Sequence, residues 1–315
     1  MKSIYKAIKT AKKILVMGHT DPDGDAIGSM TSMYILLKNL KKKAVMYCPD
    51  EVPETYKFLP YSGKIKNKLS PKLKFDLGIA VDCGDIKRLG SKINVRKMVK
   101  TLVNIDHHPD NTKFGDINYI RSISSVSEIM YGLFNFCAQP IDKRAATSLY
   151  VGIMTDTGNF RYDYTTSDTL RIAADLVDDG ANISGLAMKV YETKTMSAMK
   201  VLGAAMYGVK CSKSGRVAWS ALTSDLMAAT GARSEDLTGI VDAIRSIRGV
   251  EVAVLFREVE DGIKVNFRSK YKINVSAIAK KLGGGGHVRA SGVMIKGDID
   301  EVQQKVLKEV FKVIK

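Results

Sequence analysis

Cysteine is scarce in this sequence and has no metal-binding spacing. The four cysteines lie far apart and form no CxxC pair: Cys48, Cys83, Cys137 and Cys211. This argues against a disulfide framework and a thiolate metal site, and it favours buried free thiols in a reducing cytoplasm. No apolar run approaches the roughly 20 residues that a membrane span needs. The basic N-terminus lacks a long apolar stretch and a cleavage signal, so we expect it to belong to the fold.

Acidic residues are fewer than basic ones, 33 against 49, and the formal net charge is +16. An excess of positive charge attracts polyanions and speeds their capture. The lysines are spread along the chain, however, as on any solvated surface. The charge therefore permits a phosphate-bearing or nucleic-acid substrate without establishing one. The 315 residues, 45% of them hydrophobic, suffice for two globular domains.

The first half of the chain alternates strand-like and helical patterns. Strands are expected at Lys13–His19, Ala44–Cys48, Asp76–Cys83 and Thr101–His107. Helices are expected at Ala26–Lys41, Val126–Ala138, Lys143–Thr155 and Thr166–Asp179. This alternation predicts an α/β domain with a parallel sheet covered on both faces. Ligands of such sheets bind at the carboxyl ends of the strands.

The second half has a different pattern. A long helical stretch at Ile183–Gly208 precedes a predicted hairpin formed by Val250–Glu258 and Gly262–Ser269, with further helices around it. We therefore expect a catalytic domain at 1–185, a helical linker at 186–204 and a smaller α+β domain at 205–315, with the active site in the cleft between the two domains.

Polar side chains follow strand after strand in the first half. The first strand leads into His19, Asp23 and Asp25, and the third ends at Asp82. The fourth ends at Asp106, His107 and His108, and Asp156 ends a later helix. A single aspartate at a strand end is usually a helix cap or a turn residue.

Several carboxylates and imidazoles at one sheet edge would repel or remain unpaired without cations, which is costly. We therefore expect divalent ions there. A mixed Asp and His set without thiolates favours two Mn²⁺, with Mg²⁺, Co²⁺ or Zn²⁺ as substitutes. Two such ions lower the pKa of a shared water and neutralise phosphoryl oxygens.

The motifs HTDPDGD, VDCGD, IDHH and TDTGNF resemble, in order, those of the DHH phosphoesterase superfamily. GGGGHVRASG, at Gly283–Gly292, resembles the signature of the DHH-associated C-terminal domain. The length and plan look most like the nanoRNase branch, whose members are oligoribonucleases that also dephosphorylate 3′-phosphoadenosine 5′-phosphate (pAp).

The resemblance implies a role for each matching residue. His19 and Asp23 would bind one metal, Asp25, His107 and Asp156 the other, and Asp82 both. His108 would assist the leaving group as a catalytic residue, and Asp106 would orient an imidazole.

The second domain is expected to bind substrate. Consecutive glycines have no use in a helix or strand, and they let backbone amides approach a ligand. His287 and Arg289 would then bind a phosphate or a base, and Arg can grip phosphate with two hydrogen bonds. The expected substrate-binding residues are Arg268, Ser269, Gly284, Gly285, Gly286, His287 and Arg289.

The resemblance implies a cytoplasmic hydrolase that cleaves short RNA and linear dinucleotides such as pApA and pGpG, and that dephosphorylates pAp. A homodimer is possible. A soluble cyclic-dinucleotide phosphodiesterase remains an alternative. A RecJ-like exonuclease would need further domains, and a family II pyrophosphatase would lack the GGGGH loop. A non-catalytic RNA-binding protein is an alternative of another class, which a complete metal-ligand set disfavours.

Overall fold

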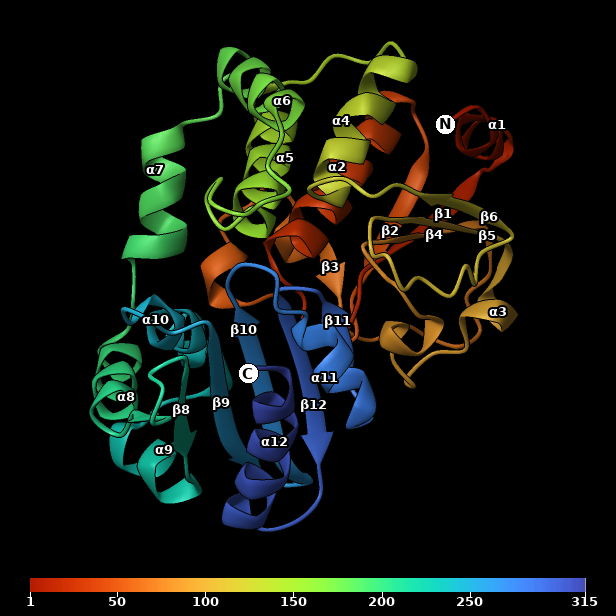
Figure 1. Cartoon of the computed structure of the whole chain (residues 1–315). Coiled ribbons are helices and arrows are strands. Elements are labelled where there is room, and N and C mark those ends of the chain that lie inside the picture. The colour runs from red at the N-terminus through yellow and green to blue at the C-terminus, as the bar shows by residue number, and fades with distance from the viewer. Residues whose placement is uncertain (315) are drawn as a thin grey trace. The chain divides into compact units, whose positions relative to one another are not determined.

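The chain forms two compact units in the computed structural model, which describes residues 1–314. The first unit comprises Met1–Thr193, and the second begins at Lys194 (Figure 1). The boundary falls inside the stretch 186–204 that we expected as a linker. No described helix has both the length and the apolarity to cross a membrane.

The first unit is built on a parallel six-stranded sheet. Its spatial order is β3-β2-β1-β4-β5-β6, with β3 at Ile65–Lys66, β2 at Lys43–Tyr47, β1 at Lys13–Met17, β4 at Phe75–Val81, β5 at Val99–Asp106 and β6 at Ile117–Ile120. All five strand pairings are parallel. The order reverses between β1 and β4, and this switch point is where doubly wound sheets bind ligands.

The two faces of this sheet have separate cores because successive strand residues point to opposite sides. In β1, Ile14 and Val16 join the larger core, whereas Leu15 and Met17 join the smaller one. Residues of α1, α2, α4, α5, α6 and α7 complete the larger core. Leu89, which ends a 3₁₀ helix at Ile86–Leu89, and the short helix α3 (Val95–Met98) contribute to the smaller one.

Most of the helices that complete the larger core begin with a side-chain cap. Asp23 caps α2, Ser125 caps α4 and Thr166 caps α6, each through a hydrogen bond to an amide that the helix leaves unpaired. Their bounds are α1 Lys2–Thr10, α2 Gly24–Asn39, α4 Val126–Phe136, α5 Lys143–Asp156, α6 Ser167–Asp178 and α7 Ile183–Ala187.

The second unit contains a mixed sheet of order β11-β12-β10-β9-β8-β7. Only β8 and β9 run parallel among its pairs in the described chain. The strands are β7 Lys210–Cys211, β8 Val217–Leu222, β9 Val252–Val259, β10 Gly262–Ser269, β11 Gly285–His287 and β12 Ala290–Ile295. The predicted hairpin is β9 and β10.

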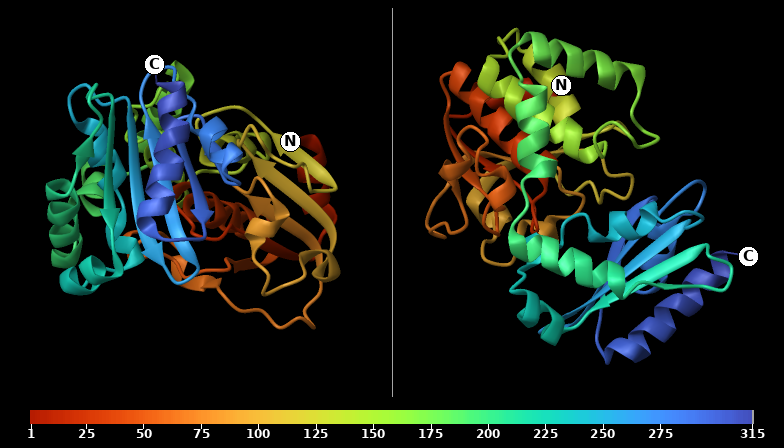
Figure 2. Two further views of the ribbon diagram at one scale, coloured as in Figure 1. Left: turned by 60° about the horizontal axis from the view of Figure 1, so that its bottom comes forward. Right: turned by 90° about the vertical axis from the view of Figure 1, so that its left-hand side faces the viewer.

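Helices cover both faces of this second sheet, as the views in Figure 2 show. Helices α11 (Val275–Lys281) and α12 (Ile299–Val313) pack on one face, in a core with β9 and β10 residues such as Val254 and Val265. Helices α8 (Met196–Tyr207) and α10 (Ile240–Ser246) pack on the other. Helix α9 spans Ser224–Thr230.

The helical stretch expected at Ile183–Gly208 is broken into separate segments. A π-helical turn follows α7 at Met188–Glu192, and the chain is extended at Thr193. Thr195 then caps α8 by accepting a hydrogen bond from the Ala198 amide at 2.9 Å. A capping threonine ends one helical segment and begins another. Helix α8 belongs to the second unit, where Val201 and Ala205 are buried.

Candidate metal centre

Asp82 lies at the end of β4, beside the point where the strand order reverses. Its φ of +55° is left-handed, which is uncommon for a residue with a side chain and typical of functional sites. The residue is 2% exposed. Its carboxylate lies 3.4 Å from Nε2 of His19 and 3.6 Å from both Nε2 of His107 and Nδ1 of His108. Asp82 is therefore the centre of the cluster.

His19 and Asp23 approach Asp82 from the loop between β1 and α2. Nδ1 of His19 lies 2.6 Å from the Thr20 carbonyl oxygen. A proton donated there leaves Nε2, which faces Asp82, available to a cation. Burial and then Arg88 lower the pKa of His19 to about 4, so the ring is neutral at pH 7. His19, Asp23 and Asp82 offer ligand atoms within 4.8 Å of one another.

His107 is oriented in the same way at the end of β5. Its Nδ1 lies 3.0 Å from the Ile123 carbonyl oxygen, and its Nε2 lies 3.2 Å from Oδ2 of Asp156 at the end of α5. Burial acts to lower the pKa of His107, but Asp156 and Asp25 outweigh it and leave the pKa raised. Asp25, His107 and Asp156 form a second group of ligand atoms within 4.8 Å.

Asp25 is also held by the start of α4. Its two carboxylate oxygens accept hydrogen bonds from the amides of Val126 at 2.6 Å and Ser127 at 2.9 Å. Each oxygen keeps further lone pairs for a cation. Gly152 of α5 permits this arrangement, because a Cβ there would lie 1.9 Å from Oγ of Ser127 and 2.7 Å from Oδ1 of Asp25.

His108 and Asp106 form an adjoining pair. Nδ1 of His108 lies 2.8 Å from Oδ1 of Asp106, which is fully buried. Oδ2 of Asp106 accepts a hydrogen bond from Nδ2 of Asn111 at 2.6 Å. Burial acts to raise the pKa of Asp106, but the hydrogen bond and charge of His108 outweigh it and lower the pKa. Asp106 is thus an ionised partner that fixes the His108 ring.

The remaining carboxylates cannot all be ionised without cations. Burial, followed by the charges of neighbouring aspartates, raises the pKa of Asp82 well above its usual range. Burial and Asp25 do the same to Asp156, and burial raises the pKa of Asp25. Oδ1 of Asp82 and Oδ2 of Asp156 have no hydrogen-bond partner among the described residues. Such buried, unpaired acceptors fit divalent cations.

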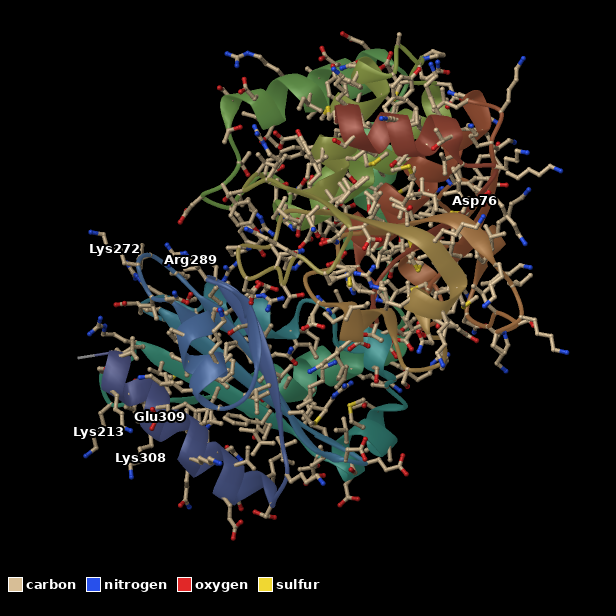
Figure 3. All side chains as sticks on the ribbon, turned by 90° about the vertical axis from the view of Figure 1, so that its right-hand side faces the viewer. Asp76, Lys213, Lys272, Arg289, Lys308 and Glu309 are labelled. Atoms are coloured by element: carbon tan, nitrogen blue, oxygen red, sulfur yellow. The ribbon has the colours of Figure 1, made fainter. Side chains whose placement is uncertain are left out.

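The expected substrate-binding residues lie in the second unit. Arg289, in the turn between β11 and β12, donates from Nη1 to the Ile273 carbonyl oxygen at 3.2 Å. Arg289 and Lys272 lie at the same end of this unit (Figure 3). Nε of Arg268 lies 3.5 Å from Oδ2 of Asp242. Ser269 is buried and donates to the Ile273 carbonyl oxygen at 2.7 Å, so its hydroxyl holds this turn. The side chain of His287 lies outside the described part.

The expectation that the glycine run has no use in a strand is wrong. Gly285 and Gly286 belong to β11 and pair with Gly292 and Ser291 of β12. A Cβ on Gly284 would lie 2.2 Å from the Gly292 carbonyl oxygen, and Gly286 has a φ of +129°. These glycines therefore permit a close approach of two strands.

Sequence reasoning missed two residues that hold the metal centre. Nη2 of Arg88 lies 3.4 Å from the Thr20 carbonyl oxygen that faces Nδ1 of His19, and Asn111 bonds Asp106. Arg88 follows the motif VDCGD by only a few positions and Asn111 follows IDHH closely. Proximity in sequence to a motif is the one signal that points to either.

Comparisons with known proteins agree with this geometry. Residues 13–153 match the DHH family, N-terminal domain, and residues 215–315 match the DHHA1 domain. The bifunctional oligoribonuclease and PAP phosphatase NrnA of Thermus thermophilus is 33% identical over 98% of this chain and 93% of its own. The protein of the same name from Bacillus subtilis is 29% identical over 93% of this chain and 92% of its own.

A solved structure shares the whole fold. The crystal structure of an exopolyphosphatase-related protein from Bacteroides fragilis superposes with a TM-score of 0.88 at 27% identity, covering 99% of this chain and 95% of that one. The chain belongs to the DHH family and carries a DHHA1 domain. The resemblance drawn from its motifs, including that to the nanoRNase branch, is confirmed.

Proposed function

We propose that this chain is a two-metal phosphoesterase that hydrolyses short oligoribonucleotides and linear dinucleotides, such as pApA and pGpG, to mononucleotides and dephosphorylates pAp to AMP. The observation that carries the proposal is a pair of three-residue ligand groups joined through the buried carboxylate of Asp82, whose Oδ1 has no hydrogen-bond partner among the described residues. The relatives named oligoribonuclease and PAP phosphatase support the choice of substrates.

The residues divide into two ligand sets. His19, Asp23 and Asp82 would hold one cation, and Asp25, His107 and Asp156 the other, with Asp82 near enough to both imidazoles to serve the two sites. When bound, two divalent cations acidify a water and neutralise the charge of a phosphoryl group. The mixture of carboxylates and imidazoles favours Mn²⁺, with Mg²⁺, Co²⁺ or Zn²⁺ as substitutes.

The pair formed by His108 and Asp106 supplies a proton. Asp106 binds Nδ1 of His108 at 2.8 Å and so orients the ring. In this proposal, Nε2 of that ring faces the leaving oxygen of the substrate and acts as its general acid. Asn111 holds the other oxygen of Asp106, which fixes the direction in which the imidazole points.

The second unit binds the rest of the nucleotide in this proposal. Arg289 would contact a phosphate, assisted by Arg268, and the backbone amides of Gly284, Gly285 and Gly286 would approach it. His287 is proposed to bind a phosphate or a base, and Ser269 to hold the turn between Arg268 and Arg289. The support is chemical, because guanidinium groups bind phosphate with paired hydrogen bonds.

The complete ligand set argues against a non-catalytic RNA-binding protein. Such a protein has no use for six buried or clustered ligands that repel one another without cations. A cyclic-dinucleotide phosphodiesterase uses the same metal chemistry, so substrate turnover must separate it from the proposed enzyme.

Turnover of a substrate panel tests the proposal. Initial rates would be measured with Mn²⁺ on pApA, pAp, cyclic di-AMP, pyrophosphate and a ladder of RNA lengths. We expect the highest kcat/KM on pApA and short RNA, clear activity on pAp, and loss of all turnover in EDTA. Preference for cyclic di-AMP or pyrophosphate would contradict the assignment. RNA binding without hydrolysis under any metal would support a binder.

We further propose a cytoplasmic enzyme that acts as a homodimer. Buried free thiols at Cys48, Cys83 and Cys137 suit a reducing compartment. Helix α8 exposes Met196, Met199 and Tyr207 on one side, and a second copy would cover apolar side chains of this kind. Light scattering after gel filtration would show twice the mass of one chain, and a monomer at micromolar concentration would contradict the dimer.

A further inference from the structure

The first unit contains a hollow that the proposed reaction does not use. Its volume is about 330 Å³, and it is lined by Phe58, Pro60, Lys143, Arg144, Thr147, Asn182, Gly185, Leu186 and Lys189. Phe58, Pro60 and Leu186 give it an apolar part. Lys143, Arg144 and Lys189 give it three cationic groups, while no carboxylate is among these lining residues. An apolar hollow edged by cationic side chains suits a ligand that combines a flat ring with an anionic group.

The Lys143 end of this hollow is remote from the metal centre. Helix α5 runs from Lys143, which lines the hollow, to Asp156, which belongs to the metal centre. With a rise of 1.5 Å for each residue, these two ends lie about 20 Å apart.

The cationic side chains at the hollow have aromatic as well as acidic neighbours. Nζ of Lys189 lies 4.7 Å from the centre of the Phe58 ring. Lys143 and Lys189 are exposed and have no carboxylate partner among the described residues. Arg144 pairs with Asp142 and also donates to the Tyr61 hydroxyl at 2.9 Å. The hollow therefore keeps a net positive charge of about two, because two of its three cations are not neutralised by a carboxylate.

The same pattern continues beside the hollow. Tyr61 packs against Tyr34 with ring centres 5.2 Å apart. Lys38 and Lys64 lie 4.9 and 5.5 Å from the centre of the Tyr61 ring. Basic side chains placed among aromatic rings are typical of surfaces that bind nucleotides, because the cations attract phosphate and the rings stack on bases.

We propose that this hollow binds a nucleoside monophosphate, with the base over Phe58 and the phosphate between Lys143 and Lys189. The volume decides between a single nucleotide and a longer ligand. About 300 Å³ is the lower limit of ordinary small-molecule sites, so the hollow has room for one nucleotide and not for an oligomer. The proposal goes beyond the proposed function, and binding in this hollow would require no metal ion.

Calorimetry on the full chain carrying Arg289→Ala, in EDTA, tests the proposal, because the metal centre then lacks the cations that would bind phosphate and the second unit lacks its proposed phosphate contact. We expect AMP to bind at one site, at least tenfold more tightly than inorganic phosphate or adenosine alone. The double variant Lys143→Ser with Lys189→Ser should weaken AMP binding at least tenfold, and so should Phe58→Leu. Lys72→Ser, on a loop next to the smaller core, is the matched control and should leave AMP binding unchanged.

A crystal of the Mn²⁺-loaded chain soaked in 8-bromo-AMP locates the ligand. The proposal predicts anomalous bromine density beside Phe58. No AMP binding in EDTA, or bromine density absent from the hollow, would overturn it. Equal affinity for phosphate and AMP would overturn the role of Phe58, and binding of an RNA pentamer without binding of AMP would overturn the choice of ligand. Because neither measurement depends on turnover, failure here leaves the proposed hydrolysis untouched.

Discussion

Asp82 is the residue on which the proposed metal centre depends most. Its side chain is nearly equidistant from His19, His107 and His108, and one of its oxygens has no hydrogen-bond partner among the described residues. Its backbone has the left-handed conformation that strained functional residues often adopt. No stabilising role within the fold explains a buried carboxylate in these surroundings.

Asp82→Asn should therefore remove most activity. The amide keeps the shape of the side chain but cannot bind cations as a carboxylate does, and loss of one such stabilising group lowers rates by about 10²–10³-fold or more. Asp76→Asn is the matched control, since Asp76 is near the start of the same strand (Figure 3). Equal kcat/KM values for the two variants on pApA with Mn²⁺ would contradict the role of Asp82.

The raised pKa of Asp82 predicts an unusual dependence of stability on pH without metal. Well below its ordinary pKa of about 3.9, this carboxyl is protonated in both the folded and unfolded states. As the pH rises, the unfolded chain loses the proton while the folded chain keeps it, so the free energy of unfolding falls. In EDTA, Asp82→Asn should therefore unfold at a higher temperature than the parent chain at pH 8.

The difference in Tm between Asp82→Asn and the parent chain should shrink toward zero as the pH falls below about 4, where the protonated Asp82 resembles the amide. Adding Mn²⁺ at pH 8 should raise the Tm of the parent chain and not that of the variant, because a ligand stabilises the state that binds it. A Tm difference that does not change with pH would show that Asp82 is ionised in the metal-free protein.

Arg289 tests the proposed role of the second unit. Arg289→Ala should raise KM for pApA about tenfold or more, because a hydrogen bond to a charged group contributes about 1.5–3 kcal/mol. The kcat should change less, since Arg289 is not proposed to contact the reacting atoms. Lys272→Ala, at the same end of that unit (Figure 3), is the control. An unchanged KM would refute the role of Arg289 in substrate binding.

At the level of single residues, the sequence predicted those groups whose position follows from strand ends. His19, Asp82 and His107 come together because parallel strands bring their carboxyl ends to one edge. Arg88 and Asn111 could not be predicted, because their contacts depend on how short turns fold back. The glycine run was misinterpreted because the close approach of β12 is a tertiary contact.

At the level of elements, the packing of α5 against α2 and α4 fixes one ligand set. Gly152 lets α5 pass so close to α4 that Asp25 reaches the amides of Val126 and Ser127. Asp156, at the end of α5, is brought opposite His107 by the same approach. The addition of one methyl group at this contact should therefore displace side chains of the metal centre.

Gly152→Ala should destabilise the protein by about 1–3 kcal/mol, the usual cost of overpacking a core, and should weaken Mn²⁺ binding by displacing Asp25. Gly203→Ala on α8 is the opposite case, because a Cβ there meets nothing within 4 Å. It should stabilise the helix by about 0.5–1 kcal/mol. Chemical denaturation compares both with the parent chain, and an unaffected Gly152→Ala would show that α5 can shift without cost.

Elements with a regular spacing of apolar residues in the sequence were predicted, and short elements were not. The strands β1, β4 and β5 agree with the sequence patterns because most of their residues are buried. Strand β2 agrees as well, although only Met46 and Tyr47 are buried in it. The edge strands β3 and β6 were missed, being two and four residues long and too short for a pattern. The strands β8 and β12 were also missed, because small residues interrupt their apolar alternation.

At the level of the whole molecule, the two units have separate cores and the candidate ligands all belong to the first. Removing the cations should therefore loosen only the first unit. Hydrogen exchange in EDTA should increase at the ends of β4 and β5 and the start of α2, and should stay unchanged in β9 and β10. Equal increases in both units would show that the cations stabilise them jointly.

Anomalous diffraction from a crystal grown with Mn²⁺ tests the central claim most directly. The account predicts two manganese peaks in each chain, one beside His19 and Asp23 and one beside Asp25, His107 and Asp156, with the Asp82 carboxylate contacting both. A crystal without manganese at these side chains, or with a single ion that Asp82 does not touch, would contradict it.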